Sequence, residues 1–447
     1  MRMLVTLGLT ICGWLLLMLA SSDSGIAAEQ GVISPQPTPE LRLSLRDAME
    51  AALDNNPNVR LFREKIAEAH GVARTQLGAL LPNVSTSVRQ SQQTFFLGTL
   101  GLSPSRTDPF SIFDARGNMS QSLFSMSLIQ RWRASREGVH VAELESDTTK
   151  NDTMAATGLL YMEALKAEAM VRSREANLRV FNELLELARG RRGGGMATGL
   201  DTARVEAQRE NERQQLAVAR YEVERVKLNL IHVLGISFDI RLTLTDDFLM
   251  EVTDAPAPQE ALATAMATRA EVKSQAQRIK AASISLSSTV SERLPSLSAQ
   301  GDYGLIGNRM NNTLDTYNVA LLLSIPIFDG GQREGRISES RSLVQQEMIR
   351  MQLVTNKVTL EVREALVTLA SAKEQLGISQ AGLKAAITEL GLARERFTIL
   401  TASSNLEVTN ALFSMVRARD NVVDAMFRLN AARVNLARAL GQLDTLH

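Results

Sequence analysis

The sequence predicts a mainly α-helical protein with a small β part, in which one helix–β-hairpin–long helix–turn–helix unit occurs twice. No proline lies between Pro109 and Pro256 or after Pro326. Because proline inside a helix costs about 3 kcal/mol, these two tracts are able to form very long helices. Aromatic residues make up only 4% of the chain, too few for an ordinary large globular core. The third observation is an internal duplication.

The duplication appears as two pairs of matching segments. Ala48–Pro82 matches Ala261–Pro295 at a constant shift of 213 residues, and both copies end in Leu-Pro. Leu200–Gly235 matches Leu406–Gly441 at a shift of 206 residues, and both copies end in Leu-Gly. Repetition at a fixed spacing indicates one structural unit used twice. We therefore expect the same order of elements in each half.

The N-terminal segment has the order of a secretory signal peptide. Arg2 is followed by the apolar run Leu4–Ala20 and then by small residues up to Ala28. Basic, apolar and small-residue regions in that order predict export, with cleavage after Ala27 or Ala28. A membrane anchor is the alternative, because the run is at the short end for a spanning helix. A lipoprotein signal fits less well, since Ile11 precedes Cys12 where a small residue is needed.

We expect each repeat to begin with a helix of about 35 residues. The first copy starts near Ser44 and ends at Leu81-Pro82, with an interruption at Asn55-Asn56-Pro57. The second copy starts near Pro258 and ends at Leu294-Pro295, with an interruption at Thr268-Arg269. Proline fits the first turn of a helix but not its interior, so it marks these boundaries.

A β-hairpin follows each of these helices. The expected strands are rich in Ser, Thr, Val and Gln, and they cover Asn83–Phe96, Phe113–Phe124, Ser296–Ile306 and Thr316–Phe328. The last strand places Val319, Leu321, Leu323 and Ile325 on one face. Glycine, proline and asparagine indicate the hairpin loops, at residues 98–109 in the first half and 307–312 in the second.

A helix of about 65 residues, roughly 100 Å long, is expected after each hairpin. It starts near Met126 or Gly331 and ends in a turn, at Arg192–Gly199 or Ile399–Asn405, before a return helix. The last return helix carries a heptad seam in which large residues alternate with alanine. Its members are Val408, Ala411, Met415, Ala418, Val422, Ala425, Leu429, Ala432, Leu436 and Ala439. Leu216, Ala219, Val223, Val226, Leu230 and Val233 form the matching seam of the first half.

These signals divide the chain into six parts. They are a signal peptide at 1–28, an N-terminal linker at 29–43, a first repeat at 44–236, an inter-repeat or equatorial linker at 237–257, a second repeat at 258–441 and a tail at 442–447. The hairpin strands lie at about 83–124 and 296–328, and the long helices at about 126–235 and 331–441.

Composition argues against several classes of site. Acidic and basic residues number 49 each, so no overall charge favours nucleic acid. The single cysteine, Cys12, lies in the predicted signal, and the four histidines are scattered, so we expect no metal site and no cofactor. Gly190–Gly195 lacks the ending of a phosphate-binding loop and more plausibly ends a helix, where Arg189, Arg191 and Arg192 complement its dipole. Asp246-Asp247 is interpreted as a solvated linker turn, and no catalytic constellation is present, so we expect no enzyme.

No long apolar run follows residue 30, so a mature chain that crosses a membrane must do so as β-strands. An open sheet would leave unpaired backbone groups in lipid, which requires closure. With four strands per chain, two copies give eight strands and a lumen filled by side chains, whereas three copies leave room for water. The sequence therefore predicts at least a trimer if the strands span a membrane.

Two segments carry a resemblance to a known family. Ser324–Gly331, with the sequence SIPIFDGG, resembles the strand-to-helix signature of TolC-type outer-membrane factors, the outer membrane efflux protein family. Gly195–Asp201, with the sequence GMATGLD, is similar to the periplasmic hairpin turn of that family. Their order and spacing, together with the duplicated layout, extend the resemblance from about residue 41 to 441.

The resemblance implies a homotrimer with a 12-stranded outer-membrane β-barrel continued by a 12-helix α-barrel through the periplasm. Such a protein is a passive exit duct of a tripartite efflux or type I secretion system. Its partners are outer-membrane lipid, a periplasmic adaptor (membrane fusion) protein and, through that adaptor, an inner-membrane pump. The exported substrate stays open among drugs, metal ions, siderophores and polypeptides.

The resemblance also assigns site residues. The pore constriction or gate falls on Asp201, Phe397, Glu407 and Asn410, and the adaptor-docking tips fall on Gly195, Thr198, Gly199, Leu200, Thr401, Ser404 and Leu406. Asn410 is neutral where relatives carry a second acidic ring, and Phe397 replaces a tyrosine, so it has no hydroxyl to donate to Asp201. A soluble periplasmic helical-hairpin scaffold or adaptor without a pore is the alternative function.

Overall fold

The computed structural model describes residues 40–101, 104–249, 255–399 and 405–445. The predicted signal peptide, residues 1–28, and the predicted tip residues Thr401 and Ser404 lie outside these ranges. The chain divides into a small unit, Met1–Glu40 with Asp239–Arg241, and a large unit, Leu41–Phe238 with Leu242–His447. The large unit is described below.

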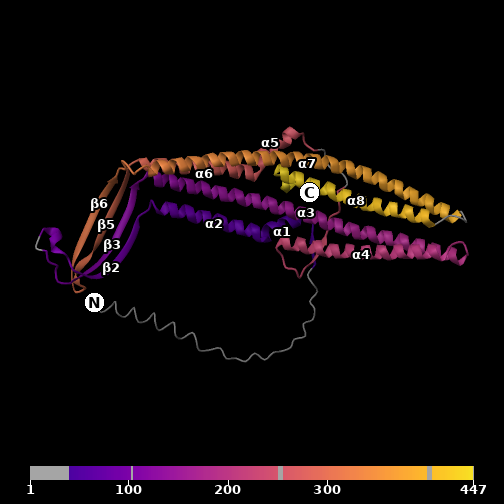
Figure 1. Cartoon of the computed structure of the whole chain (residues 1–447), viewed down its shortest axis with the longest axis horizontal. Coiled ribbons are helices and arrows are strands. Elements are labelled where there is room, and N and C mark those ends of the chain that lie inside the picture. The colour runs from indigo at the N-terminus through magenta and orange to yellow at the C-terminus, as the bar shows by residue number, and fades with distance from the viewer. Residues whose placement is uncertain (1–39, 102–103, 250–254, 400–404, 446–447) are drawn as a thin grey trace, which may run out of the picture. The chain divides into compact units, whose positions relative to one another are not determined.

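The predicted mainly helical fold with a small β part is confirmed, and the two halves repeat one order of elements (Figure 1). The first half contains α1 (Leu45–Asn55), α2 (Pro57–Gly78), β2 (Asn83–Gln93), β3 (Phe110–Phe124), α3 (Met126–Gly193) and α4 (Gly199–Leu234). The second contains α5 (Pro258–Thr268), α6 (Ala270–Val290), β5 (Ser296–Arg309), β6 (Asn312–Ser324), α7 (Gln332–Ile399) and α8 (Asn405–Leu440). Short elements are β1 (Glu40–Leu43), β4 (Arg241–Leu244), η1 (Leu97–Leu100), η2 (Ser291–Arg293) and η3 (Leu443–Thr445).

In each half, the break in the first helix forms a hydrogen bond with the C-terminal end of the return helix. Asn56, between α1 and α2, donates its side-chain amide to the Val233 carbonyl at the end of α4, at 2.6 Å. Thr268, at the end of α5, donates its hydroxyl to the Leu440 carbonyl at the end of α8. Both contacts satisfy carbonyls that a helix end leaves without an intrahelical donor. The breaks therefore contact the ends of the return helices, which stop at Gly235 and Gly441 with left-handed φ values of 71° and 67°.

The four hairpin strands form one antiparallel sheet in the order β2-β3-β5-β6. The pairing of β3 with β5 joins the two repeats, with Gly117 opposite Tyr303. The outer strands β2 and β6 each have one neighbour, so the sheet of this chain has two open edges.

The strand bounds differ from the prediction: β2 ends at Gln93, three residues before Phe96, β3 starts at Phe110, three residues before Phe113, and β6 starts at Asn312, four residues before Thr316. A tight turn at Met310-Asn311 replaces the predicted loop at 307–312, because β5 continues to Arg309 with a register shift after Gly307. The shift absorbs one extra residue, as a β-bulge does. β6 ends at Ser324, four residues before the predicted end at Phe328. Pro326, which has no N–H for a ladder hydrogen bond, lies two residues beyond this end.

α3, α4, α7 and α8 lie side by side in the order α4-α3-α8-α7, and nearer the sheet the order is α2-α3-α6-α7. The predicted seam of α8 is confirmed, since nine of its ten members are buried and Ala418 is half-buried. In the seam of α4, Leu216, Ala219, Val226 and Leu230 are buried. Alanine at alternate seam positions lets neighbouring helix axes approach closely.

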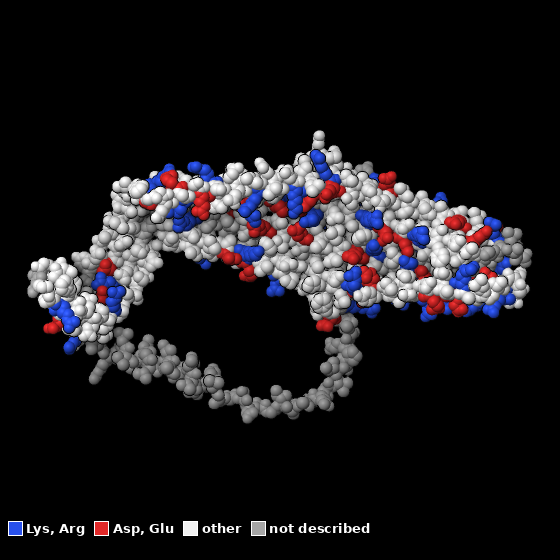
Figure 2. Space-filling model, in the orientation of Figure 1, with Lys and Arg blue, Asp and Glu red and all other residues white. Residues whose placement is uncertain are grey.

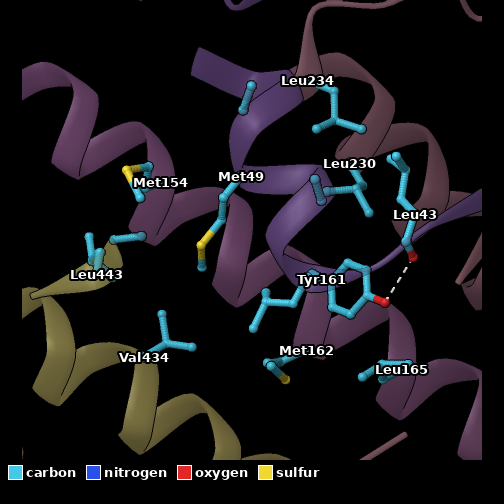
Figure 3. Packing of buried hydrophobic residues seen from close by; sticks show 14 of the residues in the cluster. Leu43, Met49, Met154, Tyr161, Met162, Leu165, Leu230, Leu234, Val434 and Leu443 are labelled. Atoms are coloured by element: carbon cyan, nitrogen blue, oxygen red, sulfur yellow. Dashed lines mark hydrogen bonds between the residues drawn. The ribbon is translucent and has the colours of Figure 1, made fainter. Parts of the chain in front are cut away.

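One apolar cluster gathers where the repeats meet, and Figure 3 shows it around Tyr161 of α3. The Tyr161 hydroxyl donates to the Leu43 carbonyl at 3.0 Å and lies 3.2 Å from the Asp246 carboxylate. Asp246 also accepts the Leu45 backbone N–H at 2.7 Å. The prediction of a solvated turn at Asp246 is therefore wrong, because this carboxylate satisfies the first amide of α1. Within the described ranges, no helix combines the length and apolar character needed to cross a membrane.

Candidate functional site

The tip of the first helical hairpin is built from glycines and a capping box. α3 ends at Gly193, and Gly195 adopts a left-handed φ of 74°, which a residue with a Cβ atom rarely adopts. α4 then starts with Thr198 as its N-cap: the Asp201 amide donates to the Thr198 hydroxyl, and the Thr198 amide donates to the Asp201 carboxylate at 3.0 Å. The turn chemistry of this short segment thus fixes the direction of the return helix.

The Thr198 contacts also change the acidity of Asp201. The Thr198 hydroxyl and backbone amide both donate to the Asp201 carboxylate, and they hold the pKa of that group below its usual value. Arg204 and Arg191 add a smaller electrostatic contribution in the same direction. Hydrogen bonds to a charged carboxylate favour the charged form. Asp201 therefore carries a negative charge at neutral pH.

At the second hairpin tip, the structure describes the residues before and after the turn. α7 reaches Ile399 and α8 starts at Asn405. Glu407 lies in the first turn of α8 and pairs with Arg396 of α7 at 3.4 Å, with both side chains more than half exposed. Asn410 is exposed one turn further along α8. Among the predicted docking residues, Gly195, Thr198, Gly199, Leu200 and Leu406 are exposed.

Arg191 and Phe397 connect the two hairpins just above their tips. The Arg191 guanidinium lies over the Phe397 ring, with its Cζ 4.3 Å from the ring centroid, and also donates to the Phe397 carbonyl. Arg191 is 7% exposed and Phe397 is 3% exposed. A cation over an aromatic face is more strongly attracted when water is excluded. The contact therefore ties the end of α3 to the end of α7.

An apolar cluster made by all four long helices supports this contact. It contains Phe181, Leu184, Leu185 and Ala188 of α3, Val205 of α4, Ala386, Leu390 and Phe397 of α7, and Val408, Ala411, Leu412, Met415 and Val416 of α8. Phe181 and Phe413 stack edge to face, with ring centroids 6.4 Å apart. Apolar burial and aromatic packing of this kind hold the hairpins together.

The sequence predicts only one role for Arg191, which is to complement the dipole at the C-terminal end of α3. Its partner on α7 is 206 residues away along the chain, and no local signal identifies such a contact. The sequence did, however, single out both residues for other reasons. The structure brings Phe397 together with Arg191, and it pairs Asp201 with Thr198 and Glu407 with Arg396.

The four-stranded sheet has one apolar face. The strand register aligns Val84, Met119, Gly301 and Val319 in one row across the sheet, and Thr86, Gly117, Tyr303 and Tyr317 in the next. Because side chains alternate between faces, Val88, Leu305, Leu321 and Leu323 lie on the same face. Val319 is 79% exposed and Tyr317 is 77% exposed. A face with so much exposed apolar surface predicts an apolar environment around it.

The opposite face of the sheet is polar and carries charge. Arg116 of β3 pairs with Asp114 at 2.7 Å and with Asp302 of β5 at 2.9 Å. Gly304 lies directly opposite Arg116, and a Cβ atom at that position would collide with the Arg116 side chain. Ser85, Ser87, Asn118 and Asn318 occupy the same face. The sheet is therefore suited to separate an apolar from an aqueous environment.

Charge is distributed differently along the helices. Acidic and basic side chains are interspersed on the face that Figure 2 shows, and many form short-range pairs such as Arg213 with Glu210. Exposed pairs of this kind contribute little stability, but they make a helical surface that is suited to water. No group of three metal-ligating side chains comes together among the residues that the structure describes.

A sequence profile of the family described as "Outer membrane efflux protein" matches the chain twice, at residues 48–236 and 261–442. The two matches start 213 residues apart and end 206 residues apart, which are the two shifts found in the sequence. Among curated proteins, the outer membrane efflux protein BepC of Brucella suis biovar 1 (strain 1330) is 24% identical over 413 residues. That match covers 90% of this chain and 86% of BepC.

Solved structures share the fold. The Campylobacter jejuni CmeC outer membrane channel superposes with a TM-score of 0.78 at 17% identity, covering 95% of this chain and 94% of that one. A membrane protein from Pseudomonas aeruginosa superposes with the same TM-score at 19% identity, covering 89% of this chain and 93% of that one. The likeness therefore extends over both the sheet and the helical hairpins.

Proposed function

Since the chain belongs to the outer membrane efflux protein family and is an outer-membrane exit duct of tripartite efflux systems, we propose that three copies close into one channel. Its strands form a 12-stranded barrel in the outer membrane, and its helices continue as a 12-helix tunnel through the periplasm. Substrates pass from the pump to the exterior without any bond being made or broken. The protein is then a conduit and not an enzyme.

The open edges of the sheet carry this proposal. β2 and β6 have 11 and 13 residues, long enough for a tilted strand to cross a bilayer, and each has one free edge. In hydrocarbon, every unpaired N–H or C=O group costs several kcal/mol. Pairing β2 of one copy with β6 of the next removes both edges. Head-to-tail contacts of this kind close a ring when the rotation between copies fits.

The width of the lumen favours three copies over two. Eight strands give a barrel that its own side chains fill, whereas twelve leave space for water. The polar face, with Arg116, Asp114 and Asp302, then lines the aqueous lumen, and Val84, Val319 and Tyr317 face lipid. This orientation satisfies both faces of the sheet.

The helical layer supports the same closure. Its outer helices are α4 on one side and α7 on the other. Both carry an exposed apolar stripe at helical spacing: Val218, Tyr221 and Leu228 on α4, and Ile349, Leu353, Leu360, Val367 and Ile378 on α7. Exposed seams with this spacing are typical of helices that lack a partner. In a ring of three copies, α4 of one copy covers α7 of its neighbour.

The hairpin tips form the gate in this proposal. Asp201, Phe397, Glu407 and Asn410 surround the narrow end, and the contact between Arg191 and Phe397 holds the two hairpins of one copy closed. The three-fold arrangement repeats the Glu407 carboxylate around the pore as an acidic ring, and the neutral Asn410 adds no further ring one turn later. Separation of the hairpins widens the tunnel.

The docking surface for the periplasmic adaptor lies at the hairpin tips in this proposal. Gly195, Thr198, Gly199 and Leu200 belong to the first tip, and Thr401, Ser404 and Leu406 to the second. Leu200 is 65% exposed and Leu406 is 48% exposed, and exposed apolar side chains are typical contact residues. The adaptor connects the duct to an inner-membrane pump.

The proposal also includes the organisation of the chain. A signal at 1–28 directs export and is cleaved, and the two repeats cover 44–236 and 258–441.

A planar bilayer tests the proposed function. Purified mature protein is expected to form trimers in detergent and to give discrete conductance steps after reconstitution. Protein that stays monomeric and water-soluble without detergent, and leaves the bilayer silent, would favour a scaffold or adaptor instead.

A further inference from the structure

The seam between the two hairpins, α3 against α8, changes character along its length. At the tip end it belongs to the apolar cluster that includes Phe181 and Leu412. At the other end it belongs to the cluster around Tyr161, which includes Val434. Between these clusters the seam is polar, with Ser173, Arg174 and Asn177 on α3 facing Arg419 and Asp420 on α8.

Arg174 lies at the centre of the polar stretch and bridges two acids. Its Nη2 lies 2.7 Å from Asp420 Oδ2 of α8, and its Nη1 lies 3.5 Å from Glu212 Oε1 of α4. Glu212 belongs to the first hairpin and Asp420 to the second. One guanidinium therefore compensates one carboxylate of each hairpin.

Two uncharged side chains complete the cluster. The Asn177 side-chain amide donates to Glu212 at 3.2 Å and its oxygen accepts from Arg419, while the Ser173 hydroxyl lies 3.4 Å from Asp420. Asn177 is fully buried, and the Glu212 side chain is 7% exposed. The Arg174 and Asp420 side chains are 16% and 22% exposed. Charges this far removed from water need their partners, because an uncompensated buried charge is strongly unfavourable.

We propose that Arg174 couples the two hairpins and thereby positions the gate. In the closed duct it holds α8 against α3 and α4 by satisfying Asp420 and Glu212 together. The cluster lies roughly 30 Å above the tip of α3, at 1.5 Å per residue. At this distance, a small separation of α8 from α3 produces a larger separation at the tips.

The physical reason is the position of the two carboxylates. Without Arg174, the partly buried Asp420 and Glu212 both lose their ion pair with this guanidinium, and the cluster is left with two carboxylates and one cation, Arg419. An uncompensated carboxylate away from water is unfavourable, which favours separation of the hairpins. Separation also lets water reach both carboxylates, which lowers the cost of their charge. If the seam were apolar at this level, separation of the hairpins would be unfavourable, because it would expose hydrocarbon to water.

The inference rests on the proposed channel function, and its test uses three variants of the full-length trimer. Arg174→Met removes the bridge while keeping a long side chain. Arg174→Met with Asp420→Asn removes one cation and one carboxylate, so that the remaining charges of the cluster, Glu212 and Arg419, balance across Asn177. Arg220→Met is the matched control, because Arg220 pairs with Glu175 inside the first hairpin at the same level and both side chains are exposed.

Open probability in planar bilayers and amide hydrogen exchange along α8 are measured for each variant. Arg174→Met is expected to raise the open probability at least tenfold and to accelerate exchange in residues 405–420. The double variant is expected to return both quantities toward the wild-type values, and Arg220→Met to leave them unchanged.

Two results would overturn the coupling. One is equal exchange and gating in Arg174→Met and Arg220→Met. The other is a change in Arg174→Met that the double variant does not reverse, since this would identify lost packing and not charge as the cause. A silent bilayer for the wild type would refute the proposed function instead, and hydrogen exchange would still decide the coupling.

Discussion

The guanidinium of Arg191 covers the ring of Phe397 and donates to the carbonyl of the same residue, so that the end of α3 holds the end of α7. Both residues are buried, although Arg191 lies next to the exposed residues 192–196. This side chain thus adds a polar contact between the two hairpins, close to the point where the tunnel is proposed to narrow.

Loss of the Arg191 contact is expected to open the gate. Arg191→Leu keeps apolar volume but removes the cation and its hydrogen bond, which is worth about 2 kcal/mol in a site shielded from water. Open probability in planar bilayers should increase by roughly an order of magnitude. Arg192→Leu, at the exposed neighbouring position, is the control and should behave as the wild type. Equal open probabilities in the two variants would remove Arg191 from the gate.

Protonation of Asp201 is expected to weaken the first turn of α4. Because its pKa is lowered in the folded protein, the stabilisation is fully present above the ordinary carboxylate pKa of 3.8 and is lost as the pH falls through the lowered value. Thr198→Ala should reduce local stability by about 1 kcal/mol at neutral pH and flatten the pH dependence. Thr198→Ser should preserve both. Amide hydrogen-exchange protection factors of residues 201–204 measure the effect. Unchanged protection factors in Thr198→Ala would contradict the prediction.

The two faces of β6 are expected to respond oppositely to a charge. Val319→Arg places a cation on the apolar face, where the penalty in a bilayer is about 2 to 4 kcal/mol near the midplane. Asn318→Arg, one residue away, places it on the polar face. The yield of folded trimer in outer-membrane fractions should fall for Val319→Arg and stay near the wild type for Asn318→Arg. The reverse order would mean that the sheet faces lipid with its other side.

Glu407 is expected to control the blockade of the duct by divalent cations. Glu407→Gln should weaken the blockade, because it removes one carboxylate from each copy. Arg396→Gln should strengthen it, since Arg396 now pairs with Glu407 at 3.4 Å; an exposed pair of this kind is worth about 0 to 1 kcal/mol, so a shift of up to roughly fivefold is expected. Glu389→Gln, exposed further along α7, serves as the control. Blocking concentrations that are the same in all variants would exclude Glu407 from the throat.

The exposed stripe of α7 is expected to be the interface between copies. Val367 is 69% exposed in the single chain, and Val367→Lys would place a charge in a contact that is otherwise apolar. The trimer fraction in detergent, measured by light scattering, should fall, whereas Val367→Leu should preserve it. Trimers of Val367→Lys with unchanged stability would show that the neighbour contacts another face.

Much of the helical part could be predicted because its signals are local. Pro57 and Pro258 lie at the first position of α2 and α5, and Thr198 with Asp201 forms a capping box within four residues. Alternating large residues and alanine on α8 indicated the buried side of that helix before any partner was known. The start of β6 was predicted less accurately. It depends on a bulge after Gly307, which no residue in the sequence indicates clearly.

The sequence alone determined the duplication, the long helices, their breaks and turns, and the apolar side of each helix, because each depends on residues a few positions apart. Only the tertiary structure decided that β3 pairs with β5, that Arg191 meets Phe397, and that Arg174 joins Glu212 to Asp420. These contacts connect residues far apart in the chain, and which partners meet depends on how the two repeats pack together. Their energies arise from burial and charge compensation, which exist only after that packing has excluded water.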